Sequence, residues 1–393
     1  MDRIYDHIDF RSEAFGKYLS QASGDGGLEP GKLTLEEELE RFSGQSFASD
    51  ILPRLTLGHE PQKENIGGPC VVALINAAQL GHDESTVRFY GCRGDDGVGE
   101  SLQQMLERTN LDLSHYRVQA SRETASTVVL SDPHYADGHG ERTFVNTIGA
   151  SWHYLPEDID ESFYDAEICL FGGTALVPRI HQGLSSMLQR AKSRGCITVV
   201  GTVYDFLNEK EHPGQRWPMG DGDVSYASID LLIVDHEEAL RLSGCPDVPS
   251  AIDFFREKGT GAVIVTCGAS HVTLWADSPL FGKVVVQTMP VSQAVGMALK
   301  QGRKGDSTGC GDNFAGGVIA SLAMQKALAA PPVGGGRVGA FDLREACRWG
   351  IVSGGFACFY YGGTYLEQRA GEKRALLQQL YDQYREQESA SRE

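Results

Sequence analysis

The sequence lacks the features that mark several large classes of protein. Its 393 residues carry 35 Lys and Arg against 53 Asp and Glu, a formal net charge of −18, which disfavours nucleic acid or an anionic membrane as a partner. The nine cysteines include no CxxC pair, which argues against zinc and fits reduced thiols. No uninterrupted apolar run approaches the ~20 residues of a spanning helix, and the acidic start is unlike a signal peptide. We therefore expect a cytoplasmic protein.

Short β-branched runs alternate with helical patterns from about residue 67 onward. The clearest runs are Cys196–Val200, Leu231–Val234 and Ala262–Thr266. Such alternation is typical of βαβ units, whose ligands bind beyond the carboxyl ends of the strands. We therefore predict an α/β protein with one domain over residues 1–393, a three-layer α/β/α sandwich around a largely parallel sheet.

Residues 117–147 depart from this alternation. Two β-like runs, Thr124–Leu130 and Arg142–Thr147, flank a turn-rich segment, which predicts a β-hairpin. An ordinary edge hairpin is one of the alternatives for this segment.

Residues 12–60 combine turn-like segments with one helical pattern. Thr34–Glu37 reads as a capping box ahead of an amphipathic stretch that ends near Phe42. We predict an inserted loop plus helix here. The charged tail, residues 386–393, is expected to fray.

The stretch Gly305–Phe314, followed by an apolar run, reads as a glycine-rich turn that opens a helix. The small residues Gly309, Cys310 and Gly311 let the backbone aim several N–H groups at one point, where the positive end of the helix dipole also lies. An anion would bind at that point. Asp312 stands beside it, where a carboxylate suits removal of a proton from a hydroxyl that attacks a phosphate. The alternative is a plain loop whose aspartate caps the helix.

This stretch resembles the C-terminal signature of the PfkB family of carbohydrate kinases, which runs Asp-Thr-x-Gly-Ala-Gly-Asp-x-Phe. The match covers Asp306–Phe314, with Ser307 and Thr308 in the Thr-x positions and Cys310 in place of Ala. The resemblance implies a ribokinase-like fold and transfer of a phosphoryl group from ATP, with Mg²⁺, to a hydroxyl of a sugar.

The resemblance also implies the roles of the residues in this stretch. Asp312 would be the catalytic base, and the amides of Gly309, Cys310, Gly311 and Asp312 itself would form the anion hole. Asp306 would lie on the nucleotide side of the site.

The segment that begins at Gly67 and Gly68 is similar to the family's N-terminal Gly-Gly-x-x-x-Asn pattern. Val72 stands where the sugar-contacting Asn is usual, and Asn76 lies one helical turn later. By resemblance both glycines and Asn76 would contact the substrate. A helix-packing or solvent-facing role for Asn76 is the alternative.

Family members usually begin with a strand that leads to a sugar-binding aspartate, and Asp2 is the candidate here. In that case the leading strand is missing and the sheet lacks a member, whereas a plain N-terminal acid is an equal alternative. Gly140–Phe144 is similar to the Gly-Glu-Arg-Thr-Phe wording of the family's β lid, for which we expect residues 1–10 and 117–147.

Two further segments resemble family motifs on the nucleotide and metal side. Asp235 and Glu238 match Asn-x-x-Glu, with Asp in place of Asn, and would orient Mg²⁺ through water. The alternative is a helix N-terminus stabilised by acidic side chains. Thr266 and Gly268 fall in a Thr-x-Gly-x-x-Gly pattern for the nucleotide, with His271 replacing the last glycine.

Together these segments predict an ATP- and Mg²⁺-dependent kinase of a sugar or sugar-like alcohol. A nucleoside kinase and a catalytically silent sugar-binding sensor are the alternatives. Because lid strands often pair between subunits in this family, we expect a homodimer that forms through the lid.

Overall fold

The structure is a computed structural model that describes residues 1–22, 24–81, 85–135, 140–303, 305–328 and 340–390. The chain forms two compact units, each described by itself. The smaller unit comprises Met1–Gly67, Gly91–Met105 and Tyr116–His153, and the larger unit comprises Gly68–Tyr90, Leu106–His115 and Tyr154–Glu393.

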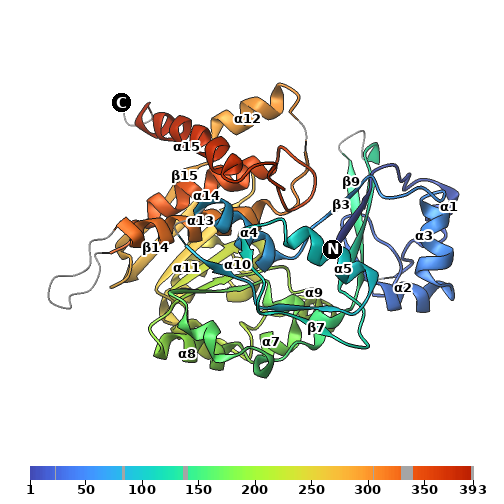
Figure 1. Cartoon of the computed structure of the whole chain (residues 1–393), viewed down its shortest axis with the longest axis horizontal. Helices are drawn as coiled ribbons and strands as arrows, with labels where there is room; N and C mark the ends of the chain where they lie inside the picture. The colour runs from blue at the N-terminus through green and yellow to red at the C-terminus, as the bar shows by residue number, and fades with distance from the viewer. Residues whose placement is uncertain (23, 82–84, 136–139, 304, 329–339, 391–393) are drawn as a thin grey trace. The chain divides into compact units, whose positions relative to one another are not determined.

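The larger unit alternates strands and helices, as the sequence pattern predicts (Figure 1). Its strands are β4 (Val87–Arg88), β6 (Leu111–Asp112), β10 (Ile168–Gly172), β11 (Ile197–Gly201), β12 (Leu231–Asp235), β13 (Ala262–Cys267), β14 (His271–Ser278) and β15 (Gly282–Pro290). Its helices are α4 (Pro69–Gly81), α7 (Pro178–Gln182), α8 (Leu184–Ser193), α9 (Phe206–Glu211), α10 (His236–Ser243), α11 (Val248–Glu257), α12 (Gln293–Lys300), α13 (Cys310–Leu328), α14 (Leu343–Ala357) and α15 (Glu372–Ala390).

Six of these strands form one sheet in the order β10-β11-β12-β13-β14-β15. The first four are parallel and the last two antiparallel, with Val199 opposite Leu231 and Ile233 opposite Ile264. Strands β11, β12 and β13 are buried on both faces, which is why they appear as continuous apolar, β-branched runs in the sequence. The predicted largely parallel sheet is confirmed.

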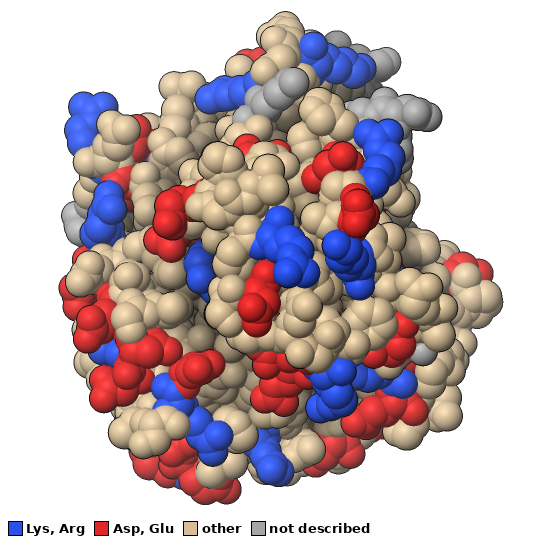
Figure 2. All heavy atoms as spheres, turned by 90° about the vertical axis from the view of Figure 1, so that its right-hand side faces the viewer, with Lys and Arg blue, Asp and Glu red and all other residues tan. Residues whose placement is uncertain are grey.

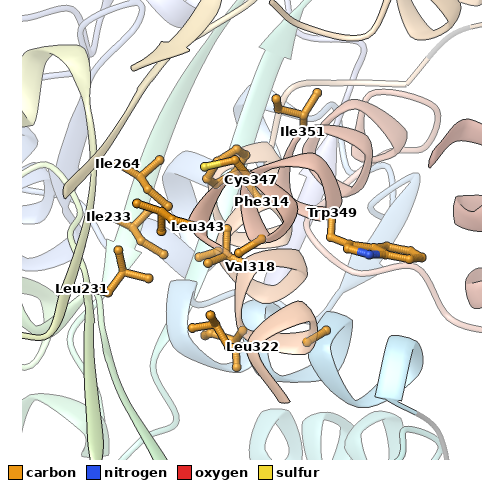
Figure 3. Packing of buried hydrophobic residues seen from close by; sticks show 14 of the residues in the cluster. Leu231, Ile233, Ile264, Phe314, Val318, Leu322, Leu343, Cys347, Trp349 and Ile351 are labelled. Atoms are coloured by element: carbon orange, nitrogen blue, oxygen red, sulfur yellow. The ribbon is translucent and has the colours of Figure 1, made fainter. Parts of the chain in front are cut away.

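Helices cover both faces of this sheet, with α13 and α14 on one side and α8 on the other (Figure 1). Figure 3 shows Leu231, Ile233 and Ile264 of the strands facing a buried cluster to which α13 contributes Val318. Trp349 of α14 points away from the strands in this view and stacks on Tyr381 of α15, with ring centroids 4.5 Å apart. The three-layer α/β/α arrangement is therefore confirmed, and α13 is fixed by the deepest part of the core.

The smaller unit is built on a five-stranded sheet in the order β2-β9-β8-β1-β3. Its strands are β1 (Asp2–Tyr5), β2 (Leu33–Leu35), β3 (Lys63–Asn65), β5 (Gly91–Gly94), β7 (Tyr116–Gln119), β8 (Ser126–Asp132) and β9 (Glu141–Thr147), and its helices are α1 (Glu13–Gly16), α2 (Glu36–Ser43), α3 (Leu52–Leu55) and α5 (Gly97–Leu106). β8 and β9 pair antiparallel, with Val128 opposite Val145, so the predicted hairpin is confirmed. Both segments expected for a lid lie in this unit.

Residues 12–60 also belong to the smaller unit and pack into its own hydrophobic core. Phe15, Leu39 and Ile51 are fully buried there. The predicted helix is present as α2, but the predicted capping box at Thr34 is wrong, because Thr34 lies in β2 and donates to the carbonyl of Gly27 at 3.0 Å. Strand pairing with β9 holds this threonine away from the helix start.

Two other expectations change at the ends of the chain. Asp2 opens β1, which pairs with β8 and β3, so Asp2 begins a strand in the sheet of the smaller unit. The tail does not fray from residue 386, because α15 continues to Ala390 and Glu388 accepts from Arg348 at 2.6 Å. Residues 391–393 lie outside the described residues.

Acidic and basic side chains are interspersed on the face shown in Figure 2, and its described residues form no continuous basic surface. No helix within the described ranges combines the length and apolar character needed to cross a bilayer.

Candidate active site

A pocket of about 140 Å³ opens in the larger unit at the carboxyl ends of its parallel strands. Strands β10 to β13 all contribute to its wall, and the N-terminal turn of α13 contributes Gly311 and Asp312. This is the edge at which ligands of parallel sheets bind. The pocket is lined by Pro69, Ala73, Leu170, Gly172, Gly173, Gly201, Thr202, Val203, Ile233, Val234, Asp235, Glu238, Thr266, Gly311, Asp312 and Ala315.

The predicted glycine-rich turn is present and leads directly into α13. Gly309 has a φ of +73°, and a Cβ there would lie 2.6 Å from the Cα of Gly363, so only glycine fits. A Cβ on Gly311 would meet nothing within 4 Å, which leaves open space beside the first turn of the helix. The amide of Cys310 donates to the carbonyl of Ser307 at 3.3 Å, so it serves the turn in this structure.

Asn313, the residue after Asp312, fixes the turn to the rest of the larger unit. Its side-chain Nδ2 donates to the carbonyls of Gly309 and Gly363, each at 2.8 Å. Its Oδ1 accepts from the Lys373 ammonium at 2.9 Å and from the Tyr360 hydroxyl at 3.3 Å. A fully bonded, buried polar side chain of this kind holds one local geometry, so Asp312 is carried on a rigid support.

Asp235 and Glu238 form a capping box at the start of α10. The amide of Glu238 donates to Asp235 at 2.8 Å, and the Glu238 carboxylate accepts from the Asp235 amide at 3.0 Å and from the Thr202 hydroxyl at 2.5 Å. Burial raises the pKa of Glu238 to about 7, and the charges of Asp235 and, more weakly, Asp312 add to the rise. The helix-terminus interpretation of this pair is therefore correct, and both side chains also face the pocket that contains Asp312.

The three residues expected on the nucleotide side occupy different structural positions. Thr266 is the penultimate residue of β13, lies opposite Asp235 and lines the pocket. Gly268 takes a φ of +51° in the tight β13–β14 turn. Asp306 accepts from the amides of Thr308 and Gly362, at 2.9 and 3.3 Å, so its carboxylate ties the glycine-rich turn to the segment after α14.

The residues expected on the sugar side fall in both units. Asp2 and Gly67 lie together in the smaller unit, where a Cβ on Gly67 would overlap the Asp2 carboxylate. Gly68 begins the larger unit, with a φ of +110° and a carbonyl that accepts from the first turn of α4. Asn76 is fully buried, and its Nδ2 donates to the carbonyl of Asn313 at 2.7 Å. The helix-packing interpretation of Asn76 replaces the substrate contact.

Sequence reasoning missed several residues that line the pocket. Gly172 ends β10 and Gly173 follows it, and side chains there would collide with Cys70 and Pro69 of the α4 start. Thr202 follows β11 and binds Glu238. They share a position at or directly after the end of a parallel strand, which the sequence does display. Asp205 in the same region is only the N-cap of α9, accepting from the Asn208 amide at 3.0 Å.

The profile of the pfkB family carbohydrate kinases matches residues 52–369. The chain belongs to this family. It is 26% identical over 266 residues to a fructokinase of Klebsiella pneumoniae, which covers 65% of this chain and 76% of the relative. It is also 25% identical over 275 residues to the aminoimidazole riboside kinase of Salmonella typhimurium, with 67% and 76% covered. The family kinases use ATP, so the chain is an ATP-dependent carbohydrate kinase.

Solved structures confirm the ribokinase-like fold of this family member. An adenosine kinase from Sinorhizobium meliloti superposes with a TM-score of 0.63 at 18% identity, covering 95% of this chain and 96% of that one. A putative ribokinase II from E. coli in complex with ATP and Mg²⁺ gives a TM-score of 0.60 at 19% identity, covering 82% and 94%.

Proposed function

We propose that the pocket at the carboxyl end of the larger unit's sheet is the phosphoryl-transfer site, with Asp312 as the general base. The observation that carries this assignment is that Asp312 lines the pocket on the first turn of α13, beside the open space at Gly311. The hydroxyl of the acceptor attacks the γ-phosphorus of ATP, and Asp312 takes the hydroxyl proton. Amides at the start of α13, those of Gly311 and Asp312 above all, stabilise charge on the transferred group.

Asp235 and Glu238 suit a hydrated Mg²⁺ ion, since both are oxygen donors in the wall of the same pocket. The raised pKa of Glu238 supports this, because a nearby cation would relieve the cost of its buried charge. When bound, the ion supplies positive charge that draws electron density from the phosphate oxygens. Within the described residues, no group of three or more His, Cys, Asp or Glu side chains is arranged to hold a metal ion.

Nucleotide contacts follow from the same geometry. Thr266 and Gly268, at and after the end of β13, offer a small and open edge for ATP. We assign Asp306 to holding the turn in place and not to direct contact with the nucleotide.

We infer that the sheet of the smaller unit is the β lid, and that Asp2, Gly67 and Gly68 contact the acceptor. The close packing of the Asp2 carboxylate on Gly67 supports this, because it fixes an acid beside the glycine pair. Edge strands β2 and β3 leave the lid sheet open to pairing with a second copy. Light scattering that finds only monomer at working concentration would contradict a lid dimer.

The acceptor is a free sugar or the sugar of a riboside. Relatives named fructokinase and ribokinase favour the first, and the aminoimidazole riboside kinase favours the second. The shared element is a sugar hydroxyl delivered to Asp312, so both acceptors use the same base.

The test is release of ADP from MgATP across ketoses, aldoses, sugar acids and nucleosides, for the wild type, Asp312→Asn and Asp382→Asn. A general base contributes typically 10²–10⁴-fold, roughly 3–5 kcal/mol of barrier, so Asp312→Asn should lose turnover by that factor. Asp382, exposed on α15, is the matched control and should leave turnover unchanged.

The outcomes separate the candidates. Turnover with one acceptor class that collapses only in Asp312→Asn supports the kinase and its base, and little change in that variant refutes the base. A folded wild type whose melting temperature rises with sugar but that releases no ADP would indicate a silent sensor.

A further inference from the structure

Two cysteine sulfurs meet at the entrance to the glycine-rich turn. Cys310 is the first residue of α13, Cys358 caps the end of α14, and their Sγ atoms are 3.4 Å apart. The other seven cysteines are also free thiols. A sulfur–sulfur contact this short, between residues 48 positions apart, comes from the way the two helices pack.

Glycines on α14 create the contact. A Cβ on Gly354 would lie 2.9 Å from the carbonyl oxygen of Cys310, and one on Gly350 would lie 2.9 Å from Val318. The helices therefore run antiparallel with their backbones close together, and the end of α14 falls against the start of α13. This approach leaves the two sulfur atoms facing each other.

We propose that Cys310 and Cys358 are a redox-active dithiol that a hydroperoxide converts into a disulfide. The Cys358 thiolate attacks the peroxide, breaks its O–O bond and becomes a sulfenic acid, while the departing oxygen takes a proton and leaves as water or an alcohol. The Cys310 sulfur then bonds to the Cys358 sulfur, and the hydroxyl leaves as water with the Cys310 proton. Two thiols and one peroxide thus give one disulfide, with two electrons passing to the peroxide.

The two sulfurs are unequal in a way that favours this order of events. The hydrogen bond between the two sulfurs lowers the pKa of Cys358, whereas the same bond and burial raise the pKa of Cys310, so Cys358 is the thiol that ionises more readily. Both residues are half-buried and within reach of a small oxidant. Cys169 and Cys196 offer the contrast, because both are buried and burial raises the pKa of Cys169 well above its usual range.

Formation of the disulfide would shift the backbone that carries the proposed catalytic groups. A disulfide S–S bond is about 2.05 Å long, so the sulfurs must approach by roughly 1.4 Å from their present separation. The turn that carries the Gly311 and Asp312 amides must absorb part of this shift. A displacement of about 1 Å can cost 10²-fold in rate, so we expect a loss of roughly that size on oxidation and recovery with dithiothreitol. This consequence rests on the proposed function, whereas the disulfide itself does not.

The first experiment therefore reads the covalent bond and not the activity. The full chain is treated with hydrogen peroxide, remaining thiols are blocked under denaturing conditions, and non-reducing peptide mass mapping follows. We expect one linked pair of peptides, containing Cys310 and Cys358, and an intact mass lower by two hydrogen atoms before blocking. Cys358→Ser should form no such link, and Cys245→Ser, a control at another half-buried thiol, should form it as the wild type does.

Other outcomes overturn the proposal. A link between different cysteines, or oxidation of Cys358 to a sulfinic acid with no link, would show that the pair is not a working dithiol. In the activity arm, oxidised wild type should lose turnover while Cys358→Ser keeps it. A linked protein with unchanged turnover would refute the effect on catalysis, and a chain without turnover before oxidation would refute the kinase assignment alone.

Discussion

The ammonium of Lys373 is buried in α15 and donates to Asn313, next to the proposed base. Desolvation lowers the pKa of Lys373 from 10.5 to about 7, and the charge of Glu367, whose carboxylate accepts from the Lys373 amide, opposes this only weakly. A folded protein near neutrality thus holds a lysine that is partly uncharged. The stability of the chain must then depend on pH in a defined direction.

The sign follows from proton binding. Between pH 7 and 10.5 the unfolded chain keeps a proton on Lys373 that the folded chain has lost, so the free energy of unfolding rises with pH in this window. The contribution is smallest below pH 7, where the folded protein carries the buried charge. With these two pKa values, the increase between pH 7 and pH 9 is about 2 kcal/mol.

The assay is urea unfolding of the wild type, Lys373→Met and Lys283→Met at pH values from 6 to 9. Lys373→Met removes the titrating group, so the wild type should gain about 2 kcal/mol relative to this variant between pH 7 and 9. Lys283, exposed on β15, is the control whose removal should leave the slope unchanged. A difference between wild type and Lys373→Met that stays flat with pH would refute the depressed pKa.

Two more predictions concern the support of the site. Gly317→Ala should destabilise the chain by about 1–3 kcal/mol, because its Cβ would lie 2.5 Å from the Ser353 hydroxyl. Gly296→Ala in α12, whose Cβ would meet nothing within 4 Å, should instead stabilise the chain by roughly 0.5–1 kcal/mol. Thermal melting of the two variants beside the wild type measures both effects. Asn313→Asp keeps the shape but cannot donate to the Gly309 carbonyl, so turnover should fall at least about tenfold while the fold persists. Unchanged steady-state turnover would show that the turn holds without this bond.

Local sequence patterns predicted much of the fold correctly, and the buried strands show why. Leu231–Val234 and Ala262–Thr266 are β-branched runs buried on both faces, and such runs have few alternatives to a parallel sheet. The turn at Gly309 was readable because its backbone conformation requires glycine. The capping box predicted at Thr34 was wrong because strand pairing with β9 outweighed the local preference of threonine for a helix cap.

Only part of the candidate site could be predicted from the sequence. Asp312 follows from its place on the turn, but nothing in the letters around Asn76 says that it binds the backbone of α13, 237 residues away. The same holds for Thr202, whose bond to Glu238 joins the end of β11 to the first turn of α10.

The family, the parallel sheet and the glycine-rich turn with its aspartate could all be predicted from the amino-acid sequence, because each depends on residues close together in the chain. The folded chain was needed to show which side chains share the pocket, that Lys373 is buried against Asn313, and that the Cys310 and Cys358 sulfurs meet. Those juxtapositions depend on how strand ends and helices far apart in the chain pack together, and packing between distant segments leaves no periodic trace in the sequence.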